Sequence, residues 1–203
     1  MGTLTSICVY CGSGIGARPA YAEAARVVGT AMGRAGIRLV YGGGSVGLMG
    51  IIAEAALKAG GEVTGIIPRF LERREGLIGN LTEILITENM HERKMLMFER
   101  AEAFVAMPGG IGTLEELVEQ MTWVQLGQHE KPVLLLNIEG FWDAFIALLG
   151  HMRKENFIRS EVEVACLIAK RAEDVVPMLQ RAAAERPQRE LEKSAAEEPL
   201  RRM

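Results

Sequence analysis

Short apolar runs alternate along the chain with longer segments in which apolar residues recur every three or four positions. The short runs are typical of strands buried on both faces, and the longer segments are typical of helices with one apolar side. The predicted strands cover residues 4–10, 37–41, 62–67, 83–87, 103–107, 132–137 and 163–169. The predicted helices cover residues 19–35, 46–59, 90–101, 113–126, 141–155 and 172–184. Residues 69–81 lack a clear period, which predicts a loop with at most a short helix.

The alternation of strands and helices predicts the fold class. We expect a single α/β domain over residues 1–184, Rossmann-like and doubly wound, with a mostly parallel sheet and helices on both faces. In such open sheets ligands bind beyond the carboxyl ends of the strands. Residues 185–203 are highly charged and lack an apolar stripe, so this tail is predicted to be disordered.

Composition narrows the function classes. The 203-residue chain is 49% hydrophobic and 24% charged, which is ordinary for a globular protein, and its net charge of −3 argues against nucleic-acid binding through a broad basic surface. Its apolar runs are shorter than the roughly 18 residues of a membrane span, and no basic flank of a signal peptide precedes the first strand. An odd count of three cysteines favours a reducing compartment, so we expect a cytoplasmic protein.

A metal site is not predicted. Cys8 and Cys11 have the spacing of a zinc-ligand pair, but residues three apart in a strand face opposite sides of the sheet. The three histidines are scattered along the sequence.

The segment from Pro108 to Glu116 reads Pro-Gly-Gly-Ile-Gly-Thr-Leu-Glu-Glu and carries the strongest functional signal. Its glycines allow positive φ angles and a close approach of the backbone to a ligand. The helix that follows points its free N–H groups at the loop, and such a helix end binds anions such as phosphate. A plain glycine-rich turn between strand and helix is the alternative interpretation.

The two carboxylates of this segment receive different predicted roles. Thr113 to Glu116 fits a capping box, in which Thr113 is the N-cap and Glu116 is a structural cap that reaches back to the backbone. Glu115 has no such local bond and is therefore predicted to face the ligand. The alternative is that both carboxylates only stabilise the helix end through its dipole.

Three further segments bear on a ligand. Gly42 to Gly50 matches neither a dinucleotide-binding loop nor a Walker A loop, but its glycines predict close backbone approach. Ser13 follows the first strand and is a candidate donor to a phosphate or ribose oxygen, with a simple turn as an equal alternative. Arg93 and Lys94 lie in the first turns of a helix, where the dipole disfavours cations, so they indicate an anionic ligand or else an exposed surface pair.

Together these motifs resemble the LONELY GUY family, the cytokinin riboside 5′-monophosphate phosphoribohydrolases. Pro108 to Glu116 is similar to the family's P-G-G-x-G-T-x-E-E hallmark without a mismatch, and Met90 to Lys94 is similar to its M-H-x-R-K companion. The triple glycine from Gly42 also looks like the family's. The resemblance runs from about residue 7 to about residue 158, and Gly14 departs from the serine that is commoner in relatives.

The resemblance implies hydrolysis of the N-glycosidic bond of a purine nucleoside 5′-monophosphate, often one with an N6-substituted adenine, to free base and ribose 5-phosphate. It also implies a homodimer that needs no cofactor. Arg93 and Glu115 would be the catalytic pair. Gly109, Gly110, Gly112 and Thr113 would hold the phosphate, and Lys94, Glu75 and Thr122 would lie in the nucleotide site. Together with Ser13, Gly43 and Gly44 of the two other loops, these are the predicted substrate-binding residues.

The implied chemistry suits these residue types. Glycosidic cleavage passes through an oxocarbenium-like state, which a fixed carboxylate stabilises while it orients a water molecule. Arginine does not deprotonate in proteins, so Arg93 is expected to orient the carboxylate and the substrate or to hold negative charge.

Two other functions remain open. A non-catalytic nucleotide or cofactor carrier of the same fold would also bind phosphate but would not need both Arg93 and Glu115. A lysine decarboxylase, a label often given to this family, would need a buried lysine for a pyridoxal Schiff base. Lys94 is the one lysine near the predicted site, and its motif is more typical of anion binding.

Overall fold

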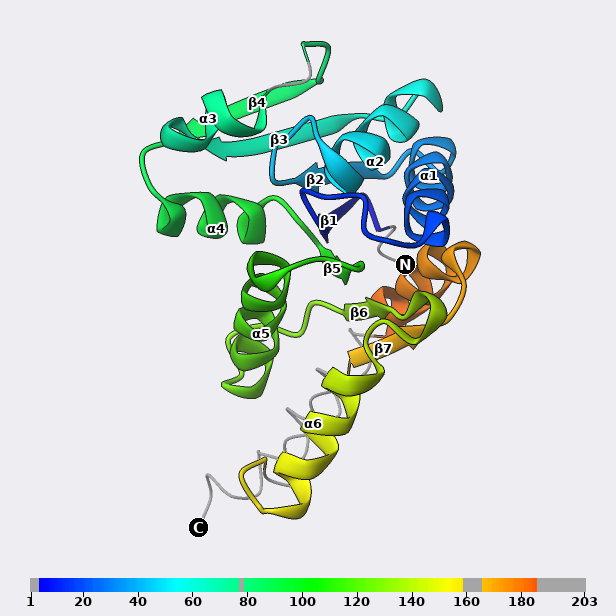
Figure 1. The fold of residues 1–203 in the computed structure, drawn as a ribbon, viewed down its shortest axis with the longest axis vertical. Helices are drawn as coiled ribbons and strands as arrows, with labels where there is room; N and C mark the ends of the chain where they lie inside the picture. The colour runs from blue at the N-terminus through cyan, green and yellow to red at the C-terminus, as the bar shows by residue number, and fades with distance from the viewer. Residues whose placement is uncertain (1–3, 77–78, 159–165, 186–203) are drawn as a thin grey trace, which may run out of the picture.

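A single parallel sheet forms the centre of the computed structural model, which describes residues 4–76, 79–158 and 166–185 (Figure 1). Across the sheet the strands follow the order β4-β3-β2-β1-β5-β6-β7, and every neighbouring pair is parallel. The strands are β1 (Ser6–Tyr10), β2 (Arg38–Tyr41), β3 (Val63–Pro68), β4 (Glu83–Thr87), β5 (Ala103–Ala106), β6 (Val133–Leu136) and β7 (Cys166–Ala169). This confirms the predicted α/β class with a parallel sheet.

Helices connect these strands. They are α1 (Pro19–Arg34), α2 (Gly47–Lys58), α3 (Arg69–Glu75), α4 (Met90–Glu99), α5 (Ile111–Gln125) and α6 (Asp143–Lys154), with the short 3₁₀ helices η1 (Ile138–Gly140) and η2 (Ala172–Asp174) and helical residues 175–185. The short helix expected within residues 69–81 is α3. The predicted tail, residues 185–203, lies outside the described residues except for Glu185. None of the described helices is both long and apolar enough to cross a membrane.

The alternation of side chains along each strand builds two apolar clusters, one on each face of the sheet. Val9 of β1 and Leu39 of β2 pack against α1 and α2, whereas Tyr10 and Val40 pack on the side of α4, α5 and α6. Figure 1 shows these two groups of helices on opposite flanks of the sheet. Cys8 and Cys11 follow the same rule, because each joins a different cluster.

Glycine allows α1 and α2 to pack closely. A Cβ atom added to Gly29 would lie 2.4 Å from the carbonyl oxygen of Ile52, and one added to Gly33 would lie 2.6 Å from that of Ala56. At these two glycines the backbone of α1 lies directly against the backbone of α2, and a bulkier residue at either position would prevent this contact.

The strand order places a switch point at the middle of the sheet. From β1 the chain adds β2, β3 and β4 on one side, then returns to place β5 on the other side of β1. The loops after β1 and β5 therefore leave the sheet in opposite directions, and ligands of open α/β sheets bind in the crevice between such loops.

Candidate functional site

A hollow of about 240 Å³ lies at the carboxyl ends of the central strands, beside the switch point. Its walls come from the end of β1, the end of β2, the first turn of α2, and the facing sides of α4 and α5. The lining residues are Val9, Tyr10, Cys11, Gly12, Ser13, Gly42, Met49, Arg93, Met97, Gly110, Ile111, Gly112, Thr113 and Glu116. Residues from all four predicted ligand segments thus meet around one space.

Backbone bonds between the glycine-rich loops give this hollow its floor. The amide of Gly12 donates to the carbonyl of Pro108 at 3.1 Å, and the amide of Leu48 donates to the carbonyl of Gly12 at 3.0 Å. Gly47 has a φ of +63°, and an added Cβ there would lie 2.3 Å from the Ser13 carbonyl carbon. The glycines of these two loops, residues 12–14 and 42–50, therefore serve mainly the close packing of one loop on the other.

The first turn of α5 opens into the hollow. Its N-cap is Gly110, and the first helical bond runs from the amide of Leu114 to the carbonyl of Gly110 at 3.1 Å. The amides of Ile111, Gly112 and Thr113 precede that bond, and all three residues line the hollow. This end of the helix can therefore bind an anion through bare peptide donors.

Arg93 joins four elements across the floor of the site. Its Nε donates to the carbonyl of Ile66 in β3 at 3.1 Å, and its Nη2 donates to the carbonyl of Gly42 after β2 at 3.4 Å. Its Nη1 forms an ion pair with Oε1 of Glu116 on α5 at 3.2 Å. A Cβ on residue 42 would lie 2.2 Å from Nη2, so the glycine makes room for the guanidinium.

Glu116 is buried with Arg93, since their side chains are only 10% and 9% exposed. Burial raises the pKa of the Glu116 carboxyl to about 7, although the positive charge of Arg93 opposes the rise. Glu116 is therefore the carboxylate of this site that changes its charge near neutral pH.

Glu115 lies outside the wall of the hollow. Its side chain is half exposed, and its Oε1 accepts a hydrogen bond from Nζ of Lys94 at 2.7 Å. The same ammonium donates to Oε1 of Glu119 at 2.8 Å. Lys94 is thus occupied by two carboxylates of α5.

The predicted capping box is wrong. The helix begins at Ile111 rather than at Thr113, and no side chain caps its N-terminus. Thr113 is therefore the third helical residue, and the carboxylate of Glu116 turns to Arg93 instead of the backbone. The buried face of α5 comprises Thr113, Glu116, Leu117, Gln120 and Met121. This spacing of three and four places Glu116 on the same face as Thr113, a signal that the sequence contained.

Most of the other predicted site residues fall into two groups. Ser13, Gly110, Gly112 and Thr113 line the hollow, as does Arg93. Gly43, Gly44 and Gly109 are not among the lining residues. Gly109 packs against Thr113, and Gly43 has a φ of +80° and packs on Ile67.

Two predicted residues need a separate account. Thr122 is exposed on α5, where its hydroxyl donates to the carbonyl of Val118 at 2.7 Å, away from the hollow. Glu75 ends α3, and its side chain lies outside the described part of the structure.

The wall also contains residues that the sequence motifs did not single out. Tyr10 and Cys11 close the end of β1, and Met49 and Met97 come from α2 and α4. Burial raises the pKa of the Tyr10 phenol and of the Cys11 thiol, so both stay neutral. Among the described residues, no three His, Cys, Asp or Glu side chains gather where they could hold a metal ion.

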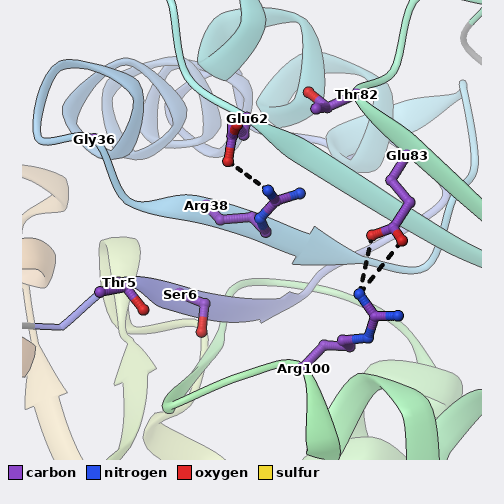
Figure 2. A pocket seen from close by; sticks show the side chains of 8 residues that line it. All are labelled: Thr5, Ser6, Gly36, Arg38, Glu62, Thr82, Glu83 and Arg100. Carbon is purple, nitrogen blue, oxygen red and sulfur yellow. Dashed lines mark hydrogen bonds and ion pairs between the residues drawn. The ribbon is translucent and has the colours of Figure 1, made fainter.

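A larger hollow of about 620 Å³ occupies the opposite edge of the sheet, at the amino ends of β1 to β4 (Figure 2). Its charges are paired with one another, as Figure 2 shows: Arg38 with Glu62, and Arg100 with Glu83 at 3.2 Å. The hydroxyl of Thr64 links the two pairs, because it accepts from Arg38 and donates to Glu83, each at 3.1 Å. The charged side chains of this hollow therefore form an ion-pair ladder across the strands.

Comparison with known proteins bears on the family. A family model described as "possible lysine decarboxylase" matches residues 49–179. A cytokinin riboside 5′-monophosphate phosphoribohydrolase of Oryza sativa subsp. japonica is 45% identical over 174 residues, which cover 86% of this chain and 72% of the rice protein. A protein of the same name from Arabidopsis thaliana is 42% identical, with 86% and 82% coverage.

Solved structures show the same fold. The molybdenum cofactor binding protein of Rippkaea orientalis has a TM-score of 0.66 at 24% identity, covering 88% of this chain and 96% of its own. The molybdenum cofactor carrier protein of Chlamydomonas reinhardtii has a TM-score of 0.68 at 19% identity, covering 90% and 99%. The extent and identity of the sequence matches show that the chain belongs to the cytokinin riboside 5′-monophosphate phosphoribohydrolase family, which the "possible lysine decarboxylase" model describes.

Proposed function

We propose that this protein hydrolyses the N-glycosidic bond of purine nucleoside 5′-monophosphates, with N6-substituted adenine nucleotides of the cytokinin type as its preferred substrates. The products are the free base and ribose 5-phosphate. One observation carries the proposal: a buried Arg93–Glu116 pair lines the same hollow as the open first turn of α5. Membership of the family, whose relatives carry this activity in their names, supports it.

The phosphate of the substrate binds at the amides of Ile111, Gly112 and Thr113, where the helix dipole favours an anion. Phosphate binding lies away from the reacting bond, so its binding energy serves to position the ribose. Ser13 faces the same space and is proposed to donate to a phosphate or ribose oxygen.

Glu116 is proposed as the catalytic carboxylate in place of Glu115, since Glu116 lines the hollow and Glu115 does not. As the bond between C1′ and the base breaks, its electron pair leaves with the base and positive charge develops on the ribose. Ionised Glu116 stabilises that charge and accepts a proton from the water that adds to C1′. The leaving base takes up a proton from a solvent water molecule, and Glu116 returns its own proton to solvent, so that the net reaction consumes one water.

Arg93 acts as a fixed cation that keeps the Glu116 carboxylate in place. Its three other contacts, to Ile66, Gly42 and Met90, leave the guanidinium little freedom. Because the reaction consumes only water, it calls for no cofactor.

We further propose that the protein acts as a homodimer. Several large apolar side chains are exposed on or beside the adjacent helices α4 and α5: Met95, Ile111, Val118 and Leu126. Thr122 lies one turn beyond Val118 on the same exposed side of α5, which suits a residue at a contact between copies. A cytoplasmic location is also proposed, and the three free cysteines support it.

The two glutamates provide the test of the site. With N6-isopentenyl-AMP and AMP as substrates, Glu116→Gln is expected to lower kcat by about 10²-fold or more, because the carboxylate that stabilises the developing charge is lost. Glu115→Gln is expected to lose less than about tenfold, since that side chain is outside the hollow. Release of base is followed by chromatography, and nucleotide binding by calorimetry.

Glu54→Gln, on the exposed side of α2, is the control and should retain wild-type turnover. Retained turnover in Glu116→Gln with loss in Glu115→Gln would reverse the assignment. Nucleotide binding by the wild-type protein without release of base would instead favour the carrier function.

A further inference from the structure

Five charged side chains form a compact network between α4 and α5. Arg93 and Lys94 are neighbours on α4, and their partners on α5 are Glu116 for the first and Glu115 and Glu119 for the second. The Lys94 side chain is only 14% exposed, and its two ion pairs are short, at 2.7 and 2.8 Å. This lysine is therefore held in one position beside the proposed catalytic pair.

Without Lys94 the network would hold three carboxylates against the single positive charge of Arg93. Glu115 and Glu119 are four residues apart on one helix, so their like charges repel each other. Both also act on Glu116, because their negative charges raise the pKa of its carboxyl. The charge of Lys94 opposes this effect.

We propose that Lys94 is a positioning residue that neutralises Glu115 and Glu119 and thereby sets the pH range in which Glu116 is ionised. The inference rests on the proposed function, because it assigns a catalytic role to ionised Glu116. It gives Lys94 a role through the carboxylates of α5, because its ammonium donates to both Glu115 and Glu119.

The other groups around Glu116 do not titrate in this range. The negative charge of Glu116 helps to raise the pKa of Cys8 and Tyr10 on β1, and Cys11 lines the same hollow. Burial raises the pKa of each of these groups above its ordinary value, so they remain neutral. Arg93 stays charged throughout. Lys94 is thus the cation whose removal changes the balance without breaking the buried pair.

The test uses two substitutions that remove opposite charges. Lys94→Met should move the titration of Glu116 upward by about one pH unit, and Glu119→Gln should move it downward. The double variant should return close to the wild-type value, and Lys94→Arg should rescue because it keeps the charge. The titration is read in the resting protein by carbon NMR of glutamate carboxyls, with Glu116→Gln to assign the signal, and again in the acid limb of kcat/KM against pH.

A purely structural clamp predicts a different result. Lys94→Met and Glu119→Gln would then both lower activity or stability and leave the Glu116 titration where it is, which would overturn the proposal. A shift of both variants in the same direction would also overturn it. The NMR titration needs no turnover, so it tests this inference even if the wild-type protein releases no base. If Lys94→Met does not fold, the test is carried by a downward shift of the Glu116 titration in Glu119→Gln and an unshifted titration in Lys94→Arg.

Discussion

Glu116 shows how burial turns an ordinary residue into a candidate catalyst. Its neighbour Glu115 has the same chemistry but is half exposed, whereas burial raises the pKa of the Glu116 carboxyl to about 7. Because the two residues are adjacent on a helix, they point in different directions: Glu116 lies in the hollow beside Arg93, and Glu115 lies against Lys94. The functional contrast between the two is therefore a matter of which side of α5 each occupies.

The same burial predicts an unusual pH dependence of stability. Because the Glu116 pKa is raised from 4.5 to about 7 on folding, the folded protein keeps a proton that the unfolded chain releases within this range. The free energy of unfolding therefore falls as pH rises through the window. Glu116→Gln removes this effect, so its stability relative to wild type should rise by about 3 kcal/mol between pH 4.5 and pH 7.

Urea unfolding at several pH values measures this difference. Glu54→Gln, at an exposed position, should keep a constant difference from wild type over the same range. A constant difference for Glu116→Gln as well would show that its carboxyl is not perturbed by folding.

At the scale of elements, most helices and strands were predictable because their patterns were long and their ends marked. Pro19 starts α1, Gly36 follows it with a φ of +65°, and Asn89 caps α4 by accepting from the amide of Glu92 at 2.9 Å. The sequence pattern predicts the start of α5 two residues too late, because Ile111 and Gly112 belong to a glycine-rich run that is typical of a loop. Each residue adds about 100° around the helix axis. A start two residues earlier therefore changes the direction of each later side chain by about 200° relative to the N-terminus of the helix.

Two helical glycines give a matched test of packing. Gly29→Ala is expected to destabilise the protein by about 1–3 kcal/mol, because the new methyl group meets the Ile52 carbonyl of α2. Gly150→Ala, in α6, finds no atom within 4 Å and should stabilise by about 0.5–1 kcal/mol.

Thermal and urea unfolding of both variants gives the comparison. Equal effects of the two alanines would mean that helix propensity alone, and not the contact between α1 and α2, decides the role of Gly29.

At the scale of the molecule, the parallel strands give the sheet two edges of different character, one at their carboxyl ends and one at their amino ends. The carboxyl edge holds the small hollow with Arg93 and Glu116, while the amino edge holds the larger hollow whose charges pair with one another. The alternating pattern predicted the first edge as the ligand side. It could not predict the ladder at the second, because Arg38, Thr64 and Glu83 come together only through strand order.

The proposed dimer is a prediction at this scale. Val118→Asp on α5 should shift the protein from dimer to monomer in analytical ultracentrifugation, since a charge would be buried between copies. Leu148→Asp, on α6, places the same charge at an exposed apolar position of similar exposure and should leave the dimer intact. A wild-type monomer, or equal effects of both substitutions, would contradict this choice of surface.

The space that Gly42 leaves for the guanidinium of Arg93 matters when relatives are compared with this chain. A homologue could keep the whole of Met90–Lys94 and Pro108–Glu116 and still carry a side chain at position 42. Its arginine would then be displaced from its socket, although both hallmark motifs would look intact. When the activity is assigned to a relative because it has both motifs, the residue at position 42 should therefore be compared as well.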